Sequence, residues 1–371
     1  MQVRAPGRVN LLGEHVDYNE GPVLPAAIDR AVYLAASTTT TNYVELYAPN
    51  IGEDVIFSLD NLASKQNLSG DPLPNWAYYP AGVAWAIQES GRQLCGIQAV
   101  YISDVPIGAG LSSSAAVEMA FAVTWQTMGG WAADPLTLAL LCQKAENLYV
   151  GVSCGLMDQF ASGHGVRDHA LLLDTRSLEW QALPLPTSTT LVIADTGVRR
   201  NLASSPYNDR RAACEKAVKI LRMDLPNIRS LRDVNPNDFS RLYHSLPLEI
   251  RMRAEHVITE IQRVFSGAAA LQSGDHDSFG ELMFSSHASL RDLYDVSTPE
   301  LNALVAISRS NPACIGARLT GAGFGGCTVN LIHQDLADNF IQDLSEQYLL
   351  NTGKEAEIFV CHASQGAGLM D

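Results

Sequence analysis

The sequence predicts an α+β protein with two lobes, the first rich in strands and the second in helices. Its 371 residues are more than one compact core usually encloses. β-Branched residues and turn signals alternate from Val3 to about Leu46, whereas apolar residues at helical spacing dominate from Tyr207 onward. We divide the lobes at 1–185 and 186–371, although no linker-like segment marks the boundary.

The periodicity of the apolar residues predicts the individual elements. In the first lobe, after the N-terminal strands, we expect helices over 76–88, 113–128 and 135–150, with strands over 99–103 and 169–174. In the second lobe we expect helices over 254–271, 278–294, 299–308 and 336–350, with strands over 190–195, near 317, and over 328–332 and 358–360. The chain contains no internal repeat and no low-complexity run.

The charge of the chain argues against two classes of partner. It has 40 acidic and 25 basic side chains, a formal net charge of −15. Such a surface repels nucleic acid and anionic membranes, so we expect neither as a partner. No stretch approaches the roughly 20 apolar residues of a transmembrane helix, and residues 1–7 lack the pattern of a secretory signal. The seven cysteines are scattered without a CxxC pair, which is typical of reduced thiols in a cytoplasmic protein.

A segment rich in glycine and serine, PIGAGLSSSAA at 106–116, lies between a predicted strand and a predicted helix. Glycine lets the backbone approach a ligand closely, and the first turn of a helix offers free N–H groups and partial positive charge. A phosphate binds well in that geometry, although no Walker-type GxxxxGK[ST] motif is present. The alternative is a serine-rich helix cap after an ordinary glycine turn.

Without a Walker lysine, a phosphate at this segment would depend on the helix end and on a divalent metal. Mg²⁺ keeps several waters and takes only one or two protein oxygens. Ser114 in the loop and Glu146 in the helix over 135–150 are the candidate ligands. A single glutamate in a helix is otherwise an ordinary solvated residue.

The opening segment, GRVNLLGEHVDY at 7–18, gathers polar residues in a mostly apolar stretch: Arg8, Glu14, His15 and Asp17. Carboxylates and a histidine that bind several hydroxyls are what a sugar site needs, because unpaired buried hydroxyls are costly. The alternative is a polar loop capped by its Asn and Asp side chains.

Two further segments contain glycines at places where a ligand or another segment could approach. In GVSCGLMDQF at 151–160, Asp158 lies in an apolar turn after a helix, where a charge needs compensation unless it serves as a helix cap. In LTGAGFGGC at 319–327, four glycines indicate a loop packed against a nucleotide or the opposing lobe, or else a tight turn.

Together these motifs resemble the GHMP kinase family and, within it, the galactokinases. The opening segment resembles the galactokinase signature, and the serine-rich segment and residues 321–327 resemble two motifs of the wider family. Segments 154–159, 204–211 and 285–292 are also similar to galactokinases. The resemblance covers nearly the whole chain, with the motifs in the expected order.

The resemblance implies a two-lobed GHMP kinase fold with the active site between the lobes. The N-terminal lobe would be like ribosomal protein S5 domain 2, and the C-terminal lobe would be ferredoxin-like. The implied activity is phosphorylation of the anomeric hydroxyl of galactose by ATP, with Mg²⁺ as cofactor.

The resemblance also assigns roles to individual residues. Catalysis falls to Asp158, with Arg8 beside it, and Trp76 resembles an aromatic residue near the adenine pocket. The implied ATP-binding residues are Gly108, Ala109, Gly110, Leu111, Ser112, Ser113 and Ser114. The implied sugar-binding residues are Glu14, His15, Asp17, Asp158 and Tyr207. The implied metal ligands are Ser114 and Glu146.

The sequence leaves three alternatives open. The nearest is the same chemistry on N-acetylgalactosamine, a uronic acid or arabinose. A more distant one is a mevalonate or homoserine kinase, against which the cluster of Glu14, His15 and Asp17 argues. The third is a non-catalytic galactose sensor, against which the intact SSSAA segment and Asp158 argue. We expect ATP and a galactose-type sugar as binding partners, and a monomeric protein.

Overall fold

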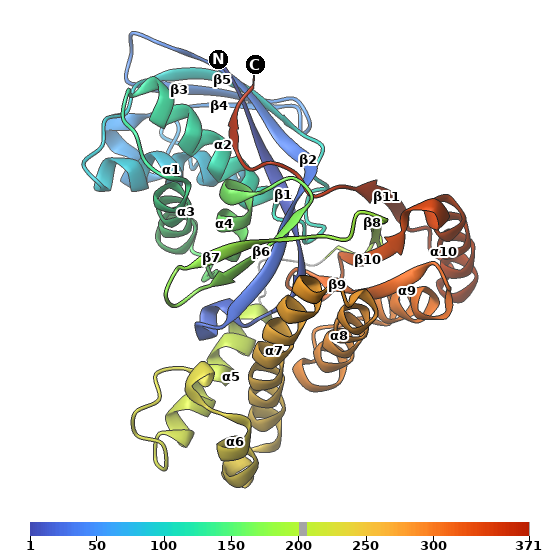
Figure 1. The fold of residues 1–371 in the computed structure, drawn as a ribbon. Coiled ribbons are helices and arrows are strands. Elements are labelled where there is room, and N and C mark those ends of the chain that lie inside the picture. Colours follow the sequence, from blue (N-terminus) through green and yellow to red (C-terminus); the bar gives the residue numbers. More distant parts are fainter. Residues whose placement is uncertain (200–205, 371) are drawn as a thin grey trace.

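The computed structural model describes residues 1–199 and 206–370, and over these residues the chain forms two sheets with helices packed on them (Figure 1). The larger sheet has the strand order β12–β1–β2–β5–β3–β4, with β6 paired to β2 and β7 paired to β6. Its strands are β1 (Gln2–Leu12), β2 (Pro22–Thr38), β3 (Tyr43–Ala48), β4 (Glu53–Ser58), β5 (Ile97–Ser103), β6 (His169–Asp174), β7 (Trp180–Pro184) and β12 (Gly368–Leu369).

Helices cover one face of the larger sheet. They are α1 (Tyr78–Glu89), α2 (Ser113–Met128), α3 (Pro135–Lys144), which continues into a π-helical segment (Ala145–Val150), and α4 (Met157–His164). Helices α2 and α4 contact β1 and β2, and α1 and α3 pack against α2. In β5, Ile97, Ala99 and Tyr101 are buried, whereas Val100 and Ile102, which alternate with them, are exposed. This alternation is expected for a strand with one covered face.

The smaller sheet is antiparallel, in the order β11–β8–β10–β9. Its strands are β8 (Thr189–Asp195), β9 (Cys314–Thr320), β10 (Cys327–His333) and β11 (Glu357–Cys361). The helices of this part are α5 (Pro206–Leu221), α6 (Pro236–Leu242), α7 (Leu248–Ser273), α8 (His276–Ser289), α9 (Pro299–Ser310) and α10 (Ala337–Thr352). Helices α8 and α9 pack on β9, α10 packs on β8, and α7 contacts α5, α8 and strands of the larger sheet.

The predicted elements agree with most of this architecture. The predicted helix over 113–128 and strand over 169–174 have the observed bounds of α2 and β6. The short α4 and β7 were not predicted, and the helical region after Tyr207 is divided between α5 and α6. The chain leaves the larger sheet after β7 and enters the smaller one at β8, but β12 returns to the larger sheet. The division into domains at 185/186 stays a prediction.

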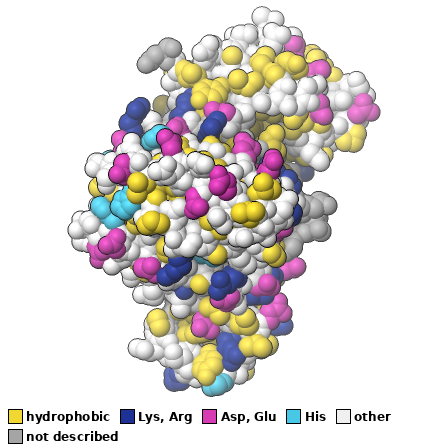
Figure 2. Space-filling model, turned by 90° about the vertical axis from the view of Figure 1, so that its right-hand side faces the viewer, with side chains coloured by type: hydrophobic (Ala, Val, Ile, Leu, Met, Phe, Trp, Pro, Cys, Tyr) yellow, Lys and Arg dark blue, Asp and Glu magenta, His cyan; other side chains and the backbone are white. Residues whose placement is uncertain are grey.

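On the face drawn in Figure 2, acidic and basic side chains are interspersed, so neither sign of charge dominates it. Among the helices of residues 1–199 and 206–370, none combines the length and the hydropathy that a membrane span requires.

The two glycine-rich loops pack against each other where the sheets meet. A Cβ atom on Gly321 would lie 2.5 Å from the carbonyl oxygen of Gly110. The backbone N–H of Arg8, in β1, donates to the carbonyl of Leu111 in the serine-rich loop (3.0 Å). Strand β1 and both loops therefore converge on one junction, and the predicted site residues lie around it.

We expect Gly321→Ala to destabilise the protein more than Gly353→Ala does. Both glycines have positive φ, +80° and +69°, so alanine costs each position about 1–2 kcal/mol in backbone strain. Near Gly353 no described atom lies within 4 Å of the added Cβ, whereas at Gly321 the Cβ meets Gly110. That contact should add roughly 1–3 kcal/mol to the loss in free energy of unfolding, measured by urea denaturation. Equal losses for the two variants would contradict the close packing of the loops.

Candidate active site

Asp158 lies in the first turn of α4, where two hydrogen bonds and an ion pair fix its carboxylate. The Arg8 guanidinium donates to Oδ1 from Nε (2.8 Å), with Nη2 at 2.7 Å in the ion pair, and the Ser112 hydroxyl donates to Oδ2 (2.6 Å). Arg8 is buried, and its Nη1 donates to the carbonyl of Gly110 (2.6 Å). Because 29% of the Asp158 side chain is exposed, the carboxylate is fixed and still reachable. Its position two residues after the N-cap residue Leu156 means that it is not a helix cap.

The serine-rich loop reaches this carboxylate through a backbone in which alternate residues have positive φ. Gly108, Gly110 and Ser112 have φ values of +71°, +83° and +61°. The residues between them, Ala109 and Leu111, are buried and anchor the loop. Ser112 is the N-cap residue of α2, but its side chain does not cap the helix and instead donates to Asp158. The first N–H groups of α2 and its partial positive charge can therefore bind a phosphate beside Asp158.

Asp17 lies close to Asp158, in the turn that follows β1. Its Oδ1 accepts a hydrogen bond from the backbone N–H of Tyr18 (2.9 Å). Gly155 packs against it so closely that a Cβ atom there would lie 1.9 Å from Asp17 Oδ2. Burial and the nearby charge of Asp158 raise the pKa of Asp17 to about 6. Only glycine fits at position 155, so the segment that carries Asp158 also determines where Asp17 can lie.

His15 is held by an aromatic cluster. Its Nδ1 accepts from the Tyr18 hydroxyl (2.9 Å), and its Nε2–H donates to the carbonyl of Ala322 (3.1 Å). The Tyr18 hydroxyl is also hydrogen-bonded to that of Tyr294 (2.7 Å), and the Tyr207 ring lies 5.5 Å from the imidazole. Burial lowers the pKa of His15 to about 3, so the ring is neutral. Both ring nitrogens are engaged within the protein.

Glu14 forms an ion pair at the base of the site. Its Oε2 accepts from Arg318 Nη2 (2.9 Å) and from the backbone N–H of Gly321 (3.1 Å). Arg318 is fully buried, and its Nη1 lies 3.8 Å from the carboxylate of Glu260 in α7. Burial raises the pKa of Glu14 to about 7, and Arg318 opposes that rise. Burial would also raise the pKa of Glu260, but the charges of Arg263 and Arg318 bring it down to about 2.

The two candidate metal ligands lie near each other. Glu146, in the π-helical segment after α3, is close enough to Ser114, near the start of α2, for that side chain to oppose the rise in its pKa that burial causes. Its Oε2 also accepts from the Gln159 amide (2.6 Å), which donates in addition to Glu118 (3.0 Å). Burial raises the pKa of Glu146 to about 7 and that of Glu118 well above its ordinary value.

These oxygens suit a divalent cation that also binds a nucleotide. Within residues 1–199 and 206–370, no group of three or more His, Cys, Asp and Glu side chains could hold a metal ion. Mg²⁺ with a nucleotide needs only one or two protein oxygens, and a hydroxyl beside a carboxylate, as at Ser114 and Glu146, provides them. The buried Oε1 of Glu118 has no hydrogen-bond partner among the described residues.

Two parts of the predicted site are less closely tied to this cluster. Trp76 is half-buried, its Nε1 donates to Glu53 (2.6 Å) and its ring lies 6.0 Å from that of Tyr101, so its place near adenine stays a prediction. Of the predicted segment 204–211, Ser204 and Ser205 lie outside the described residues.

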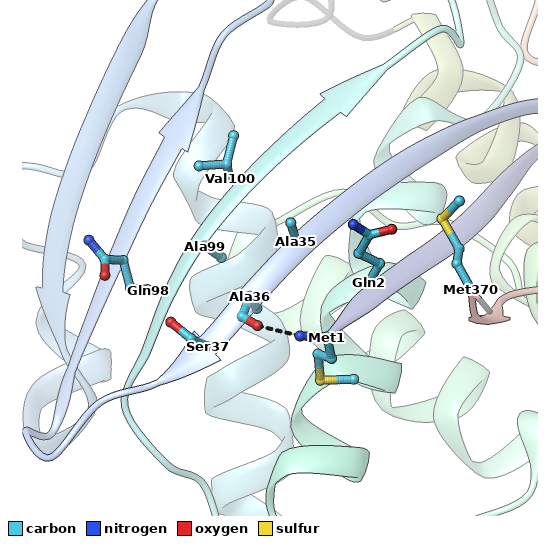
Figure 3. A pocket seen from close by; sticks show the side chains of 9 residues that line it. All are labelled: Met1, Gln2, Ala35, Ala36, Ser37, Gln98, Ala99, Val100 and Met370. Atoms are coloured by element: carbon cyan, nitrogen blue, oxygen red, sulfur yellow. Dashed lines mark hydrogen bonds between the residues drawn. The ribbon is translucent and has the colours of Figure 1, made fainter.

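A surface hollow of about 680 Å³ lies on the larger sheet, and none of the predicted site residues lines it (Figure 3). It is lined by Met1, Gln2, Ala35, Ala36, Ser37, Gln98, Ala99, Val100 and Met370. None of these side chains is ionisable, and the N-terminal ammonium donates to the carbonyl of Ala36 (2.8 Å). The hollow therefore offers no group for phosphoryl transfer, and the chemistry belongs to the junction of the loops.

Comparisons with known proteins agree with this geometry. Residues 1–38 match the galactokinase galactose-binding signature, residues 78–166 the N-terminal domain of GHMP kinases, and residues 268–349 their C-terminal domain. The chain is 47% identical over 366 residues to a galactokinase of Roseiflexus sp. (strain RS-1), covering 99% of this chain and 92% of that protein. The chain belongs to the galactokinase family. It is also 39% identical over 368 residues to a galactokinase of Bacillus subtilis (strain 168), with 98% and 93% covered.

Solved structures show the same fold. A Lactococcus lactis galactokinase complexed with galactose has a TM-score of 0.94 and 32% identity, covering 100% of this chain and 95% of that one. A mevalonate kinase has a TM-score of 0.67 at 17% identity, which shows a shared fold alone. The predicted two-lobed α+β fold of the GHMP kinases is confirmed. Membership of the galactokinase family excludes the mevalonate kinase and homoserine kinase alternatives.

Three buried residues near the site were missed from the sequence: Glu118, Gln159 and Arg318. Glu118 follows Ser114 by four residues in an apolar helix, so a lone charge on that face was the available signal. For Gln159, the only available signal was its position next to Asp158. Arg318 precedes the glycine-rich loop, and its partner Glu14 is 304 positions away, so no local pattern links the two.

We expect Arg318→Met to destabilise the protein strongly, because it leaves Glu14 buried without its cation. The loss in free energy of unfolding should be about 3–5 kcal/mol at neutral pH. It should be smaller near pH 5, since the raised pKa of Glu14 lets that carboxyl take up a proton as pH falls.

The matched control is Arg309→Met, which breaks an exposed pair with Glu281 and should cost no more than about 1 kcal/mol. Urea denaturation at both pH values measures these losses. Similar losses for the two variants would contradict the central place of Arg318.

Proposed function

We propose that this member of the galactokinase family transfers the γ-phosphoryl group of ATP to the anomeric hydroxyl of galactose, giving galactose 1-phosphate and ADP. The observation that carries the proposal is the Asp158 carboxylate, held by Arg8 and Ser112 at the edge of the serine-rich loop. A phosphate on that loop and a sugar hydroxyl at Asp158 would be neighbours. The galactokinase relatives, and the L. lactis galactokinase complexed with galactose, support ATP and galactose as the substrates.

In this proposal Asp158 orients the anomeric hydroxyl and accepts its proton as the new O–P bond forms. A carboxylate is a weak base toward a sugar hydroxyl, but in a loose transition state the proton leaves late. Orientation therefore provides much of the effect of Asp158. Arg8 balances the charge of the carboxylate and fixes its orientation.

The sugar would be bound by the polar residues of the signature turn together with Tyr207. Asp17 and Asp158 provide carboxylate oxygens for its hydroxyls. The ring nitrogens of His15 are bonded to Tyr18 and Ala322, and Glu14 is paired with Arg318. We propose that Glu14 and His15 fix the shape of the sugar site, and that any direct bond to the sugar replaces one of these contacts.

The ATP phosphates would lie on the loop from Gly108 to Ser114. Ser114 and Glu146 would hold Mg²⁺, which when bound neutralises phosphate charge and favours departure of ADP. The cytoplasmic location and the monomeric state stay predictions.

We expect Asp158→Asn to lower kcat by at least about 10³-fold while ATP still binds. The change keeps the shape of the side chain but removes its charge and its capacity to accept a proton. The matched control is Asp134→Asn, at the N-cap of α3, where asparagine caps equally well and kcat should not change. Steady-state kinetics and calorimetric titration with ATP measure the two effects. Retention of most of kcat would show that Asp158 is not the catalytic group.

We expect galactose to be preferred over glucose by about 10³-fold or more in kcat/KM. A site built to hydrogen-bond a hydroxyl strongly rejects an analogue that leaves its buried polar groups unpaired, and only the 4-hydroxyl distinguishes these two sugars. Asp17→Ala should lose most of the activity toward galactose.

A kinase assay with galactose, glucose, N-acetylgalactosamine and arabinose tests this specificity and the function itself. Comparable values for galactose and glucose would contradict a galactose-specific site. Galactose binding without turnover would favour the non-catalytic sensor.

A further inference from the structure

Gln159 is a buried amide that two carboxylates share. It is 0% exposed and follows Asp158 in α4. Its Nε2 donates to Glu146 Oε2 (2.6 Å) and to Glu118 Oε2 (3.0 Å). The Cys154 thiol also donates to Glu146 Oε2 (3.1 Å), and the Ser114 side chain lies nearby, so the hydrogen bonds to this buried carboxylate come from neutral groups.

The groups around Gln159 come from neighbouring turns of two helices. Ser114 and Glu118 are four residues apart in α2 and therefore lie on one face of it. Asp158 and Gln159 are consecutive in α4, so their side chains leave the helix about 100° apart. Asp158 binds Arg8 and Ser112, whereas Gln159 binds the two glutamates.

This arrangement leaves polar atoms unpaired inside the protein. Among the described residues, Oε1 of Gln159 and Oε1 of Glu118 are buried without a hydrogen-bond partner. An apolar pair at these positions would avoid that cost, because unpaired buried polar atoms are unfavourable. Stability alone therefore does not account for the amide and its second carboxylate.

We propose that Gln159 is a positioning residue for Glu146, and that Glu118 anchors the Gln159 amide. The inference rests on the proposed function, in which Ser114 and Glu146 hold the Mg²⁺ of the nucleotide. One NH₂ group has two hydrogens, and each is directed to one carboxylate, so Glu118 fixes the amide and the amide fixes Glu146 beside Ser114. Through Gln159, one turn of α4 sets both the metal-binding carboxylate and Asp158.

The change that tests this link is Gln159→Met, which keeps the length of the side chain but removes both donors. Loss of a residue that orients a metal ligand typically weakens metal binding about 10–100-fold. We expect the Mg²⁺ concentration for half-maximal binding of a fluorescent ADP analogue, measured by anisotropy, to rise at least about 10-fold. Nucleotide affinity should recover at saturating Mg²⁺, and calorimetric binding of galactose without nucleotide should be unchanged.

The control is Thr124→Val, also in α2, which removes a buried hydroxyl that donates to the carbonyl of Ala120 (2.8 Å). It should lower stability without moving the Mg²⁺ dependence. If Gln159→Met does not fold, Gln159→Asn tests the same link, because its amide is one methylene too short to reach both carboxylates. Gln159→Asn should raise the Mg²⁺ concentration for half-maximal binding of the ADP analogue as Gln159→Met does.

Parallel measurements on Ser114→Ala and Glu146→Ala separate this inference from the proposed function. If these two variants shift the Mg²⁺ dependence and a folded Gln159 variant does not, Gln159 has no positioning role. An equal shift in Thr124→Val would also overturn the inference. If neither Ser114→Ala nor Glu146→Ala shifts it, the metal assignment fails and the inference fails with it, while galactose turnover can still be present.

Discussion

The site depends on one constraint, which is that the buried Arg8 guanidinium must be paired. It lies in β1, and its partners are Asp158 in α4 and the carbonyl of Gly110 in the serine-rich loop. Ser112, from the same loop, completes the hydrogen bonds of the carboxylate. Because one cation holds both the loop and the carboxylate, a phosphate on the loop and a hydroxyl at Asp158 would keep a fixed geometry. The electrostatic requirement of one arginine thus produces the alignment that phosphoryl transfer needs.

The signature turn after β1 connects this junction to the smaller sheet. Glu14 binds Arg318 and the Gly321 N–H, and His15 donates to Ala322. These polar side chains therefore fasten the second glycine-rich loop to the first sheet. Asp17 differs from them, since it lies beside Asp158 and its raised pKa reflects burial and that neighbouring charge. The same short segment thus has both a structural and a substrate-binding part, and the composition of the segment does not distinguish them.

Local patterns in the sequence predicted the elements with strong periodicity. Helix α2 has 16 residues and β6 has no exposed position, whereas α4 has only eight residues and three of the five residues of β7 are exposed. The site residues were chosen from motif resemblance, and the structure brings Arg8, Ser112 and Asp158 together across 150 positions. No local pattern shows which side chains are hydrogen-bonded to each other. Ser112 does not cap its helix but binds Asp158, and Gln159 binds two glutamates. Both arrangements depend on tertiary contacts alone.

The central claim is that Arg8 acts through Asp158 and not independently of it. A double-mutant cycle of Arg8→Met and Asp158→Asn tests this most directly. The measured quantity is the single-turnover rate of phosphorylation of radiolabelled galactose with enzyme in excess, which extends to very slow variants. We expect the double variant to be far less impaired than the product of the two single losses, because either change alone already breaks the pair. Losses that multiply in the double variant would contradict it, since Arg8 would then contribute without the carboxylate.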